Sequence, residues 1–193
     1  MLKISTTLDG NVTNEEVKGA VVFLFVQDHL LLIQRSENMT THKGQLAFIG
    51  GHREESDNDL IETAIREFKE ETDRHIEDIE FMGILPPVAT MQSKLITPVL
   101  AHTHETPHNF IEQIKSNGEW DEAIIVKYQS LMDMDFWTHA KTYSNRKDYS
   151  ILFRSLKHND VVLSSQNQKE HFVLWGATAR MIWNFHHEIW SKV

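Results

Sequence analysis

Three glutamates at helical spacing are the residues of this sequence best suited to chemistry. Glu67, Glu70 and Glu71 stand at positions i, i+3 and i+4, so a helix would place them on one face. Carboxylates crowded in this way repel each other unless a cation lies between them, and a hard divalent ion such as Mg²⁺ or Mn²⁺ prefers several carboxylate oxygens. The spacing therefore predicts a divalent-metal site, and the alternative is a solvated helix face, the usual meaning of a run of charges.

Two neighbouring features suit a metal site. Arg66 directly precedes the glutamates, and its two-pronged donor geometry could orient a carboxylate or bind a phosphate oxygen. The pair Gly50 and Gly51 carries no side chains, so the backbone there could approach a metal closely. We therefore treat the segment from Gly50 to Glu71 as the candidate site.

A helix over residues 57–72 must position the carboxylates. Apolar residues recur in it at three- and four-residue spacing and form one stripe: Leu60, Ile61, Ala64, Ile65 and Phe68. Either Asp57 or Asp59 is expected to cap the start of this helix, because short acidic side chains accept hydrogen bonds from its free N–H groups. The stripe would face the core and leave the glutamates on another side.

The remaining elements predict an α/β fold. We expect buried strands first, then the helix, more strands, a late hairpin and a long terminal helix, so that helices cover both sides of a sheet. The expected strands are residues 18–27, 30–34, 46–49, 76–85, 95–102 and 123–128; the hairpin joins 149–156 to 161–164, and the terminal helix covers about 170–190.

Composition excludes several classes of function. The chain has 193 residues and a net charge of −9, and it contains no cysteine, which excludes disulfides, thiolate metal sites and a cysteine nucleophile. Net acidity disfavours nucleic acid as a partner. The longest apolar run, residues 20–26, is too short to cross a membrane. We expect a cytoplasmic protein with no membrane partner.

The net charge is local. Between Glu54 and Glu80 lie twelve acidic and three basic residues, which carry the whole excess of nine negative charges, because the rest of the chain has sixteen of each sign. The acidity therefore belongs to the candidate site rather than to the surface as a whole.

The sequence resembles the Nudix hydrolase family. Arg66, Glu67, Phe68, Glu70 and Glu71 match the second half of the family's box, and Arg66 lies fifteen residues after Gly51, one more than in the general box. That extra residue resembles the coenzyme A pyrophosphatase branch, as do residues 48–51 (Phe-Ile-Gly-Gly), 31–36 (Leu-Leu-Ile-Gln-Arg-Ser), 42–48 (His-Lys-Gly-Gln-Leu-Ala-Phe) and 175–179 (Trp-Gly-Ala-Thr-Ala).

The resemblance implies a fold and an activity. The fold would be a single Nudix domain over residues 1–193, an α/β/α sandwich with a central mixed β-sheet and its box at about residues 50–73. The activity would be metal-dependent cleavage of a nucleoside diphosphate linked to another group. In the coenzyme A branch the products are adenosine 3′,5′-bisphosphate and 4′-phosphopantetheine.

The resemblance also implies roles for individual residues. Glu67, Glu70, Glu71 and the Gly51 carbonyl would hold Mg²⁺ or Mn²⁺, with Arg66 beside them. A general base is expected at Glu119 or Glu122, both in an acidic turn. The substrate side would be lined by residues of the branch signature and the glycine pair: Arg35, His42, Gln45, Gly50 and Gly51.

Departures from the branch leave the substrate open. Ile49 replaces the usual proline, Asp73 the glycine that ends the box, and Thr40 an arginine that could contact a phosphate. The alternatives to coenzyme A are another nucleotide, such as ADP-ribose, NADH or a dinucleoside polyphosphate, and a Nudix domain that binds a nucleotide without cleaving it. A homodimer is expected by family analogy alone.

One histidine pair lies outside these motifs. His102 and His104 alternate at the end of an expected strand, so their side chains would point the same way. We expect them to face solvent, with a second metal site as the alternative.

Overall fold

The computed structural model of the protein describes residues 17–90, 94–133, 137–144, 147–157, 161–164 and 171–189. Its strands are β1 (Val17–Val26), β2 (His29–Arg35), β3 (Leu46–Ala47), β4 (Gly50–His52), β5 (Glu80–Ile84), β6 (Val88–Ala89), β7 (Leu95–Thr103), β8 (Trp120–Lys127), β9 (Thr138–Ser144), β10 (Lys147–Lys157), β11 (Val161–Leu163) and β12 (His171–Trp175). Its helices are α1 (Leu60–Thr72), α2 (Pro107–Gln113), α3 (Tyr128–Met132), α4 (Gly176–Asn184) and the π-helical turn η3 (Phe185–Ile189).

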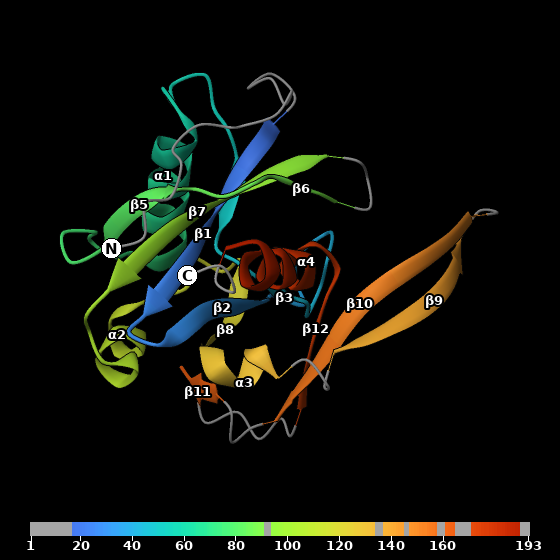
Figure 1. Ribbon diagram of the computed structural model, residues 1–193. Coiled ribbons are helices and arrows are strands. Elements are labelled where there is room, and N and C mark those ends of the chain that lie inside the picture. Colours follow the sequence, from blue (N-terminus) through green and yellow to red (C-terminus); the bar gives the residue numbers. More distant parts are fainter. Residues whose placement is uncertain are drawn as a thin grey trace.

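A large mixed sheet forms the centre of the molecule (Figure 1). Its strand order is β11-β8-β2-β1-β7-β5, with the short strands β3, β4 and β6 paired beside β2, β1 and β7. Strands β1 and β7 run parallel, and the other described pairs in this sheet are antiparallel. The chain therefore has the α/β architecture with a central mixed sheet that the sequence predicts.

Helices pack on both faces of this sheet (Figure 1). On one face, Leu60, Ala64 and Phe68 of α1 pack against alternate residues of the central strands, such as Leu24. On the other face, residues of α4 and η3 pack against the residues in between, such as Phe23, whose ring centroid lies 4.9 Å from that of Phe185. Because strand side chains alternate between faces, one strand supplies both cores.

The predicted late hairpin is wrong. Residues 147–157 form β10, which pairs with β9 and β12 in a separate three-stranded sheet, whereas β11 pairs with β8 at the edge of the large sheet. We predicted that these two strands pair with each other because they are close together in the sequence. The ribbon β9–β10 instead extends away from the body of the molecule (Figure 1).

The terminal helix begins later than predicted. Residues 171–175 form β12, in which Phe172 and Leu174 are buried and Val173 is exposed, the alternation of a strand. The helix α4 begins at Gly176, whose φ of +68° suits glycine. The predicted end residues 170 and 190 lie outside the described residues. Expected strand 76–85 is also shorter, because residues 76–79 form a turn before β5.

No helix among the described residues has the length and apolar character needed to cross a membrane.

Candidate functional site

Helix α1 is fixed at both ends by acidic residues. Asp59 caps its start, because the side-chain oxygen Oδ1 accepts from the N–H groups of Ile61 and Glu62 at 2.9 and 2.8 Å. At the other end Asp73 adopts the left-handed conformation at φ +50°, and its N–H donates to the Lys69 carbonyl at 3.0 Å. The chain thus ends the helix with an Asp in a conformation that usually favours glycine.

Arg66 connects the candidate site residues. Its Nε and Nη2 donate to the two carboxylate oxygens of Asp57 at 3.1 and 3.0 Å. Its Nη1 donates to Glu67 at 3.0 Å and to Glu70 at 3.2 Å, and Nη2 also donates to the His52 carbonyl at 2.9 Å. The guanidinium therefore orients two of the three glutamates predicted as metal ligands.

Asp57 anchors this arginine from a buried position. Only 6% of Asp57 is exposed, and besides Arg66 it accepts from the Thr63 hydroxyl at 3.0 Å and the Glu54 N–H at 2.9 Å. The hydrogen bonds from Arg66 hold the pKa of this carboxyl at about 2, despite a burial that raises it. The sequence offers Asp57 as one of two possible helix caps, whereas in the structure it supports Arg66.

Glu71 is a buried carboxylate with one oxygen free. It is 2% exposed, and its Oε1 accepts from the Gly50 N–H at 2.9 Å. Its Oε2 is buried without a hydrogen-bond partner. Burial raises the pKa of Glu71 to about 8, and the negative charges of Glu119 and Glu67 raise this pKa further while Arg35 lowers it.

Glu67 lies directly against Gly51. A Cβ atom on Gly51 would lie 2.5 Å from Glu67 Oε1, closer than atoms can approach. Burial raises the pKa of Glu67 as well, and the hydrogen bond from Arg66 opposes this rise. Glu70, by contrast, is 55% exposed. A side chain at position 51 would therefore require the Glu67 carboxylate to move. The predicted approach of the Gly51 backbone to a metal stays a prediction.

These residues fit a divalent cation. The orphaned oxygen of Glu71 and the half-buried carboxylate of Glu67, which lies against the backbone of Gly51, are the kind of oxygen ligands that a hard cation requires. In the described part of the chain, no three His, Asp or Glu side chains already surround one point, and Arg66 donates hydrogen bonds to both Glu67 and Glu70. A bound cation would compete with the arginine for these two carboxylates.

Trp120 fixes the C-terminal turn of α1 beside the carboxylates. Its indole Nε1 donates to the Glu71 carbonyl at 2.9 Å, and the side chain is 4% exposed. Sequence reasoning missed this residue. The signal available was a tryptophan inside an acidic turn, where a buried indole needs an acceptor.

The two candidate general bases lie in different surroundings. Glu119 is near enough to Glu67 and Glu71 to raise the pKa of both. Glu122 is 2% exposed and accepts from the Ser164 hydroxyl at 2.8 Å. It precedes Ala123, whose side chain belongs to the α1 face, so alternation places Glu122 on the α4 face. The structure thus brings Glu119, and not Glu122, to the side of Glu67 and Glu71.

Of the predicted substrate residues in the branch signature, one lies near the carboxylates of α1 and the other two lie in a separate turn. Arg35 is near enough to Glu71 to lower its pKa, and its Nε is buried without a hydrogen-bond partner. His42 and Gln45 contact each other, with Nδ1 and Oε1 3.1 Å apart, in a turn where Arg35 and Gln45 also pair through their backbones at 2.9 Å. No hydrogen bond between described residues joins this turn to α1.

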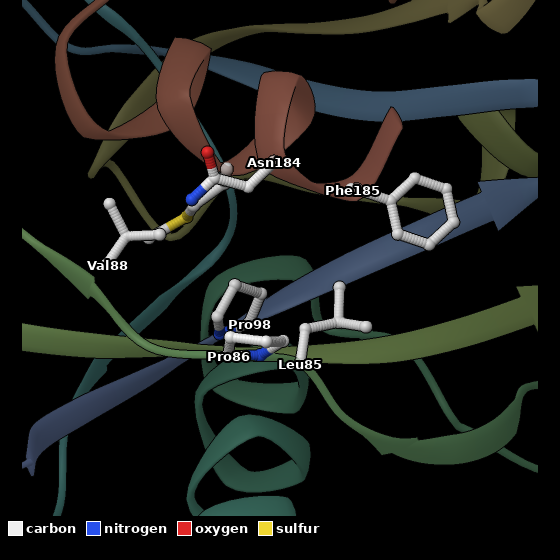
Figure 2. A pocket seen from close by; sticks show the side chains of 7 residues that line it. Leu85, Pro86, Val88, Pro98, Asn184 and Phe185 are labelled. Atoms are coloured by element: carbon white, nitrogen blue, oxygen red, sulfur yellow. The ribbon is translucent and has the colours of Figure 1, made fainter. Parts of the chain in front are cut away.

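A small apolar pocket lies on the other side of the sheet (Figure 2). It holds about 230 Å³, including its open mouth, between α4, η3 and the strands β6 and β7; it is lined by Leu85, Pro86, Val88, Pro98, Met181, Asn184 and Phe185. None of the predicted site residues lines it, and α1 packs on the opposite face. This pocket is therefore separate from the carboxylates.

Comparison with known proteins decides the family. The model of the family described as NUDIX domain matches residues 16–151, well over half of the chain. The chain belongs to the Nudix family. The box residues Arg66, Glu67, Glu70 and Glu71 lie inside the matched range.

Named relatives of this Nudix chain match it over a shorter range. It is 41% identical to "Uncharacterized Nudix hydrolase NudL" of Pectobacterium atrosepticum over 71 residues, and this stretch covers 37% of each chain. It is 46% identical to the protein of the same name from Klebsiella aerogenes over 74 residues, and this stretch covers 38% of this chain and 62% of that one. The matches thus span less than two thirds of these relatives' lengths.

Solved structures show more distant likeness. The Nudix hydrolase RenU of M. smegmatis is 20% identical with a TM-score of 0.48, over 61% of this chain and 74% of that one. An Ap4A hydrolase of C. elegans is 19% identical with a TM-score of 0.46, over 58% and 81%.

Proposed function

We propose that this Nudix domain is a metal-dependent pyrophosphohydrolase that cleaves a nucleoside diphosphate linked to another group. The observation that carries the proposal is the buried carboxylate of Glu71, which has one oxygen bonded to the Gly50 N–H and the other without a partner. A buried carboxylate oxygen with no donor is costly unless a cation satisfies it. A protein that binds no metal there would be more stable without this buried carboxylate.

In this proposal Glu67, Glu71 and the Gly51 carbonyl hold Mg²⁺ or Mn²⁺, and Glu70 supplies an outer oxygen. When bound, the cation neutralises diphosphate charge and activates the attacking water. Arg66 is fixed by Asp57 and orients Glu67 and Glu70. Glu119, on the same side as these carboxylates, is proposed to take the proton of the attacking water as general base.

Coenzyme A is the substrate that we propose within this class. Support comes from the branch signature in the sequence, which contains Arg35, His42 and Gln45. The buried Nε of Arg35 without a partner adds a donor that a phosphate oxygen would satisfy. Thr40 in place of the branch arginine favours the second candidate, a nucleotide that lacks the 3′-phosphate of coenzyme A, such as ADP-ribose. The cytoplasmic location and the homodimer stay predictions.

The deciding experiment measures hydrolysis with Mg²⁺ or Mn²⁺ for coenzyme A, dephospho-coenzyme A, ADP-ribose, NADH and a dinucleoside polyphosphate. We expect turnover of at least one of them, and a loss of about 10²–10³-fold in Glu71→Gln. The matched control is Glu112→Gln, an exposed glutamate on α2, which should keep full activity.

The possible outcomes separate the alternatives. Preference for coenzyme A over dephospho-coenzyme A would support the branch assignment, and the reverse preference would support the second candidate. Tight nucleotide binding without turnover would show a binding domain and refute catalysis. Full activity in Glu71→Gln would refute the metal site itself.

A further inference from the structure

A histidine pair on the α4 face of the large sheet has no role in the proposed hydrolysis. His102 lies on β7, and His104 follows directly after the strand ends at Thr103. Residues two apart on a strand point to the same side, and their ring centroids lie 4.6 Å apart at an angle of 76°. His104 is exposed and His102 is half-buried, so solvent reaches the pair.

The spacing of these rings suits chelation. Two imidazole nitrogens about 2.0–2.1 Å from one tetrahedral ion place the two ring centroids roughly 5 Å apart. The observed separation of the His102 and His104 centroids, 4.6 Å, is close to that value. Because both rings rise from one strand segment, little conformational entropy is lost when they bind one ion.

A carboxylate lies on the neighbouring strand. Glu80 of β5 is directly opposite His102 of β7 in the antiparallel register, which places the two side chains on the same face with Cβ atoms about 4.5–5.5 Å apart. Glu80 is exposed, and its charge raises the pKa of His102, against the larger effects of burial and of His104. Two imidazoles and one carboxylate form a donor set typical of zinc and related ions.

We propose that His102 and His104 chelate a transition-metal ion of the zinc, nickel or copper class, with Glu80 turning toward them as a third ligand. The turn is needed because no three such side chains among the described residues already converge. The ion would connect the edge strand β5 to β7 and leave one position to water.

This site is distinct from the one at α1. Gly51 pairs with Ala20 of β1, and His102 pairs with Phe25 of the same strand. Five residues of strand separate these positions, roughly 17 Å at about 3.3 Å per residue. The two sites also differ in chemistry, because imidazole favours zinc, nickel and copper whereas carboxylates favour magnesium and manganese.

The test is calorimetric titration of the untagged full chain with Ni²⁺, in excess Mg²⁺ that occupies the carboxylates of α1. We expect one Ni²⁺ site, weakened at least tenfold in His104→Ala and in His102→Ala, and weakened less in Glu80→Gln. Matched controls are His75→Ala and His108→Ala, two exposed histidines elsewhere, which should bind as the parent does. His104 is exposed, so its variant keeps the test valid if His102→Ala fails to fold.

A second readout places the ion. Substoichiometric Cu²⁺ should broaden the NMR signals of the His102 and His104 rings before those of other histidines, because broadening falls steeply with distance from a paramagnetic ion. Absence of Ni²⁺ binding at millimolar concentration would overturn the proposal. Equal affinity in the parent and His104→Ala, or first broadening at a different histidine, would do the same, whether or not the chain hydrolyses any nucleotide.

Discussion

Replacing Asp57 with asparagine would test whether this buried carboxylate supports the site through its charge. Asparagine keeps the size of the side chain but exchanges one acceptor oxygen for an NH₂ group. In the folded protein, Arg66 donates to both Asp57 oxygens at 3.1 and 3.0 Å. In Asp57→Asn one of these donors would face another donor, and Arg66 would lose its closest buried counter-charge.

The structure sets the size and sign of the effect. The pKa of Asp57 falls from its usual 3.8 to about 2, and a tenfold change in proton affinity is about 1.4 kcal/mol, so the ionised form adds roughly 2 kcal/mol to stability at neutral pH. Arg66 remains 20% exposed, and partial solvation reduces this to about 1–2 kcal/mol. Because folding lowers the pKa, this contribution is present above pH 3.8 and is lost as the pH falls through about 2.

Urea denaturation of the parent and Asp57→Asn at pH 7 and at pH 3 measures this contribution. We expect the variant to be about 1–2 kcal/mol less stable at pH 7, with a smaller difference at pH 3. Asp78→Asn, at an exposed position, is the matched control and should change stability by less than about 0.5 kcal/mol at both pH values. A loss below about 0.5 kcal/mol at pH 7, or one of equal size at both pH values, would refute the reasoning.

Four further substitutions test the site from other sides. Gly51→Ala places a methyl group 2.5 Å from Glu67 Oε1 and should lower metal-dependent hydrolysis about 10–100-fold; normal activity would show that the contact has no role. Glu119→Gln should lower kcat about 10²–10⁴-fold while Glu122→Gln lowers it far less, and the reverse order in the rate assay would reassign the base. Trp120→Phe leaves the Glu71 carbonyl without its indole donor and should cost about 1–3 kcal/mol in urea denaturation; unchanged stability would contradict that role.

The helix that carries the box could be predicted because its signals are local. Of the predicted apolar stripe, Leu60, Ala64 and Phe68 are buried and Ile61 and Ile65 are half-buried. Asp59 caps the start of the helix. The helix begins at Leu60 rather than residue 57 because Asp59 is its cap, and the carboxylate of Asp57 instead accepts from Arg66 and Thr63. A carboxylate near a helix start suits both roles, so the sequence alone left them undecided.

Strand partners could not be predicted, because pairing depends on contacts distant in sequence. Strands β10 and β11 are neighbours in the chain, yet β11 pairs with β8 through Leu163 opposite Ile124. Likewise, Phe172 and Trp175 fit the spacing of a helix, although residues 171–175 form a strand beside β10. A short apolar run fits both the helical period of about 3.6 residues and the strand period of 2. The segment that packs beside the run in the fold decides which structure forms.

One irregularity in strand pairing lies between the two candidate bases. Gln34 of β2 pairs with Glu122, and the next residue, Arg35, pairs with Trp120, so Asp121 is an extra residue on β8. An extra residue changes the face on which the preceding side chains lie. Trp120 consequently packs on the α1 face although regular alternation would place it beside Glu122. No residue type in the acidic turn specifies this bulge, and so sequence reasoning weighed Glu119 and Glu122 equally. Alternation from Trp120 would turn Glu119 back to the α4 face, so the turn before β8, rather than the strand register, brings the Glu119 carboxylate near Glu67 and Glu71.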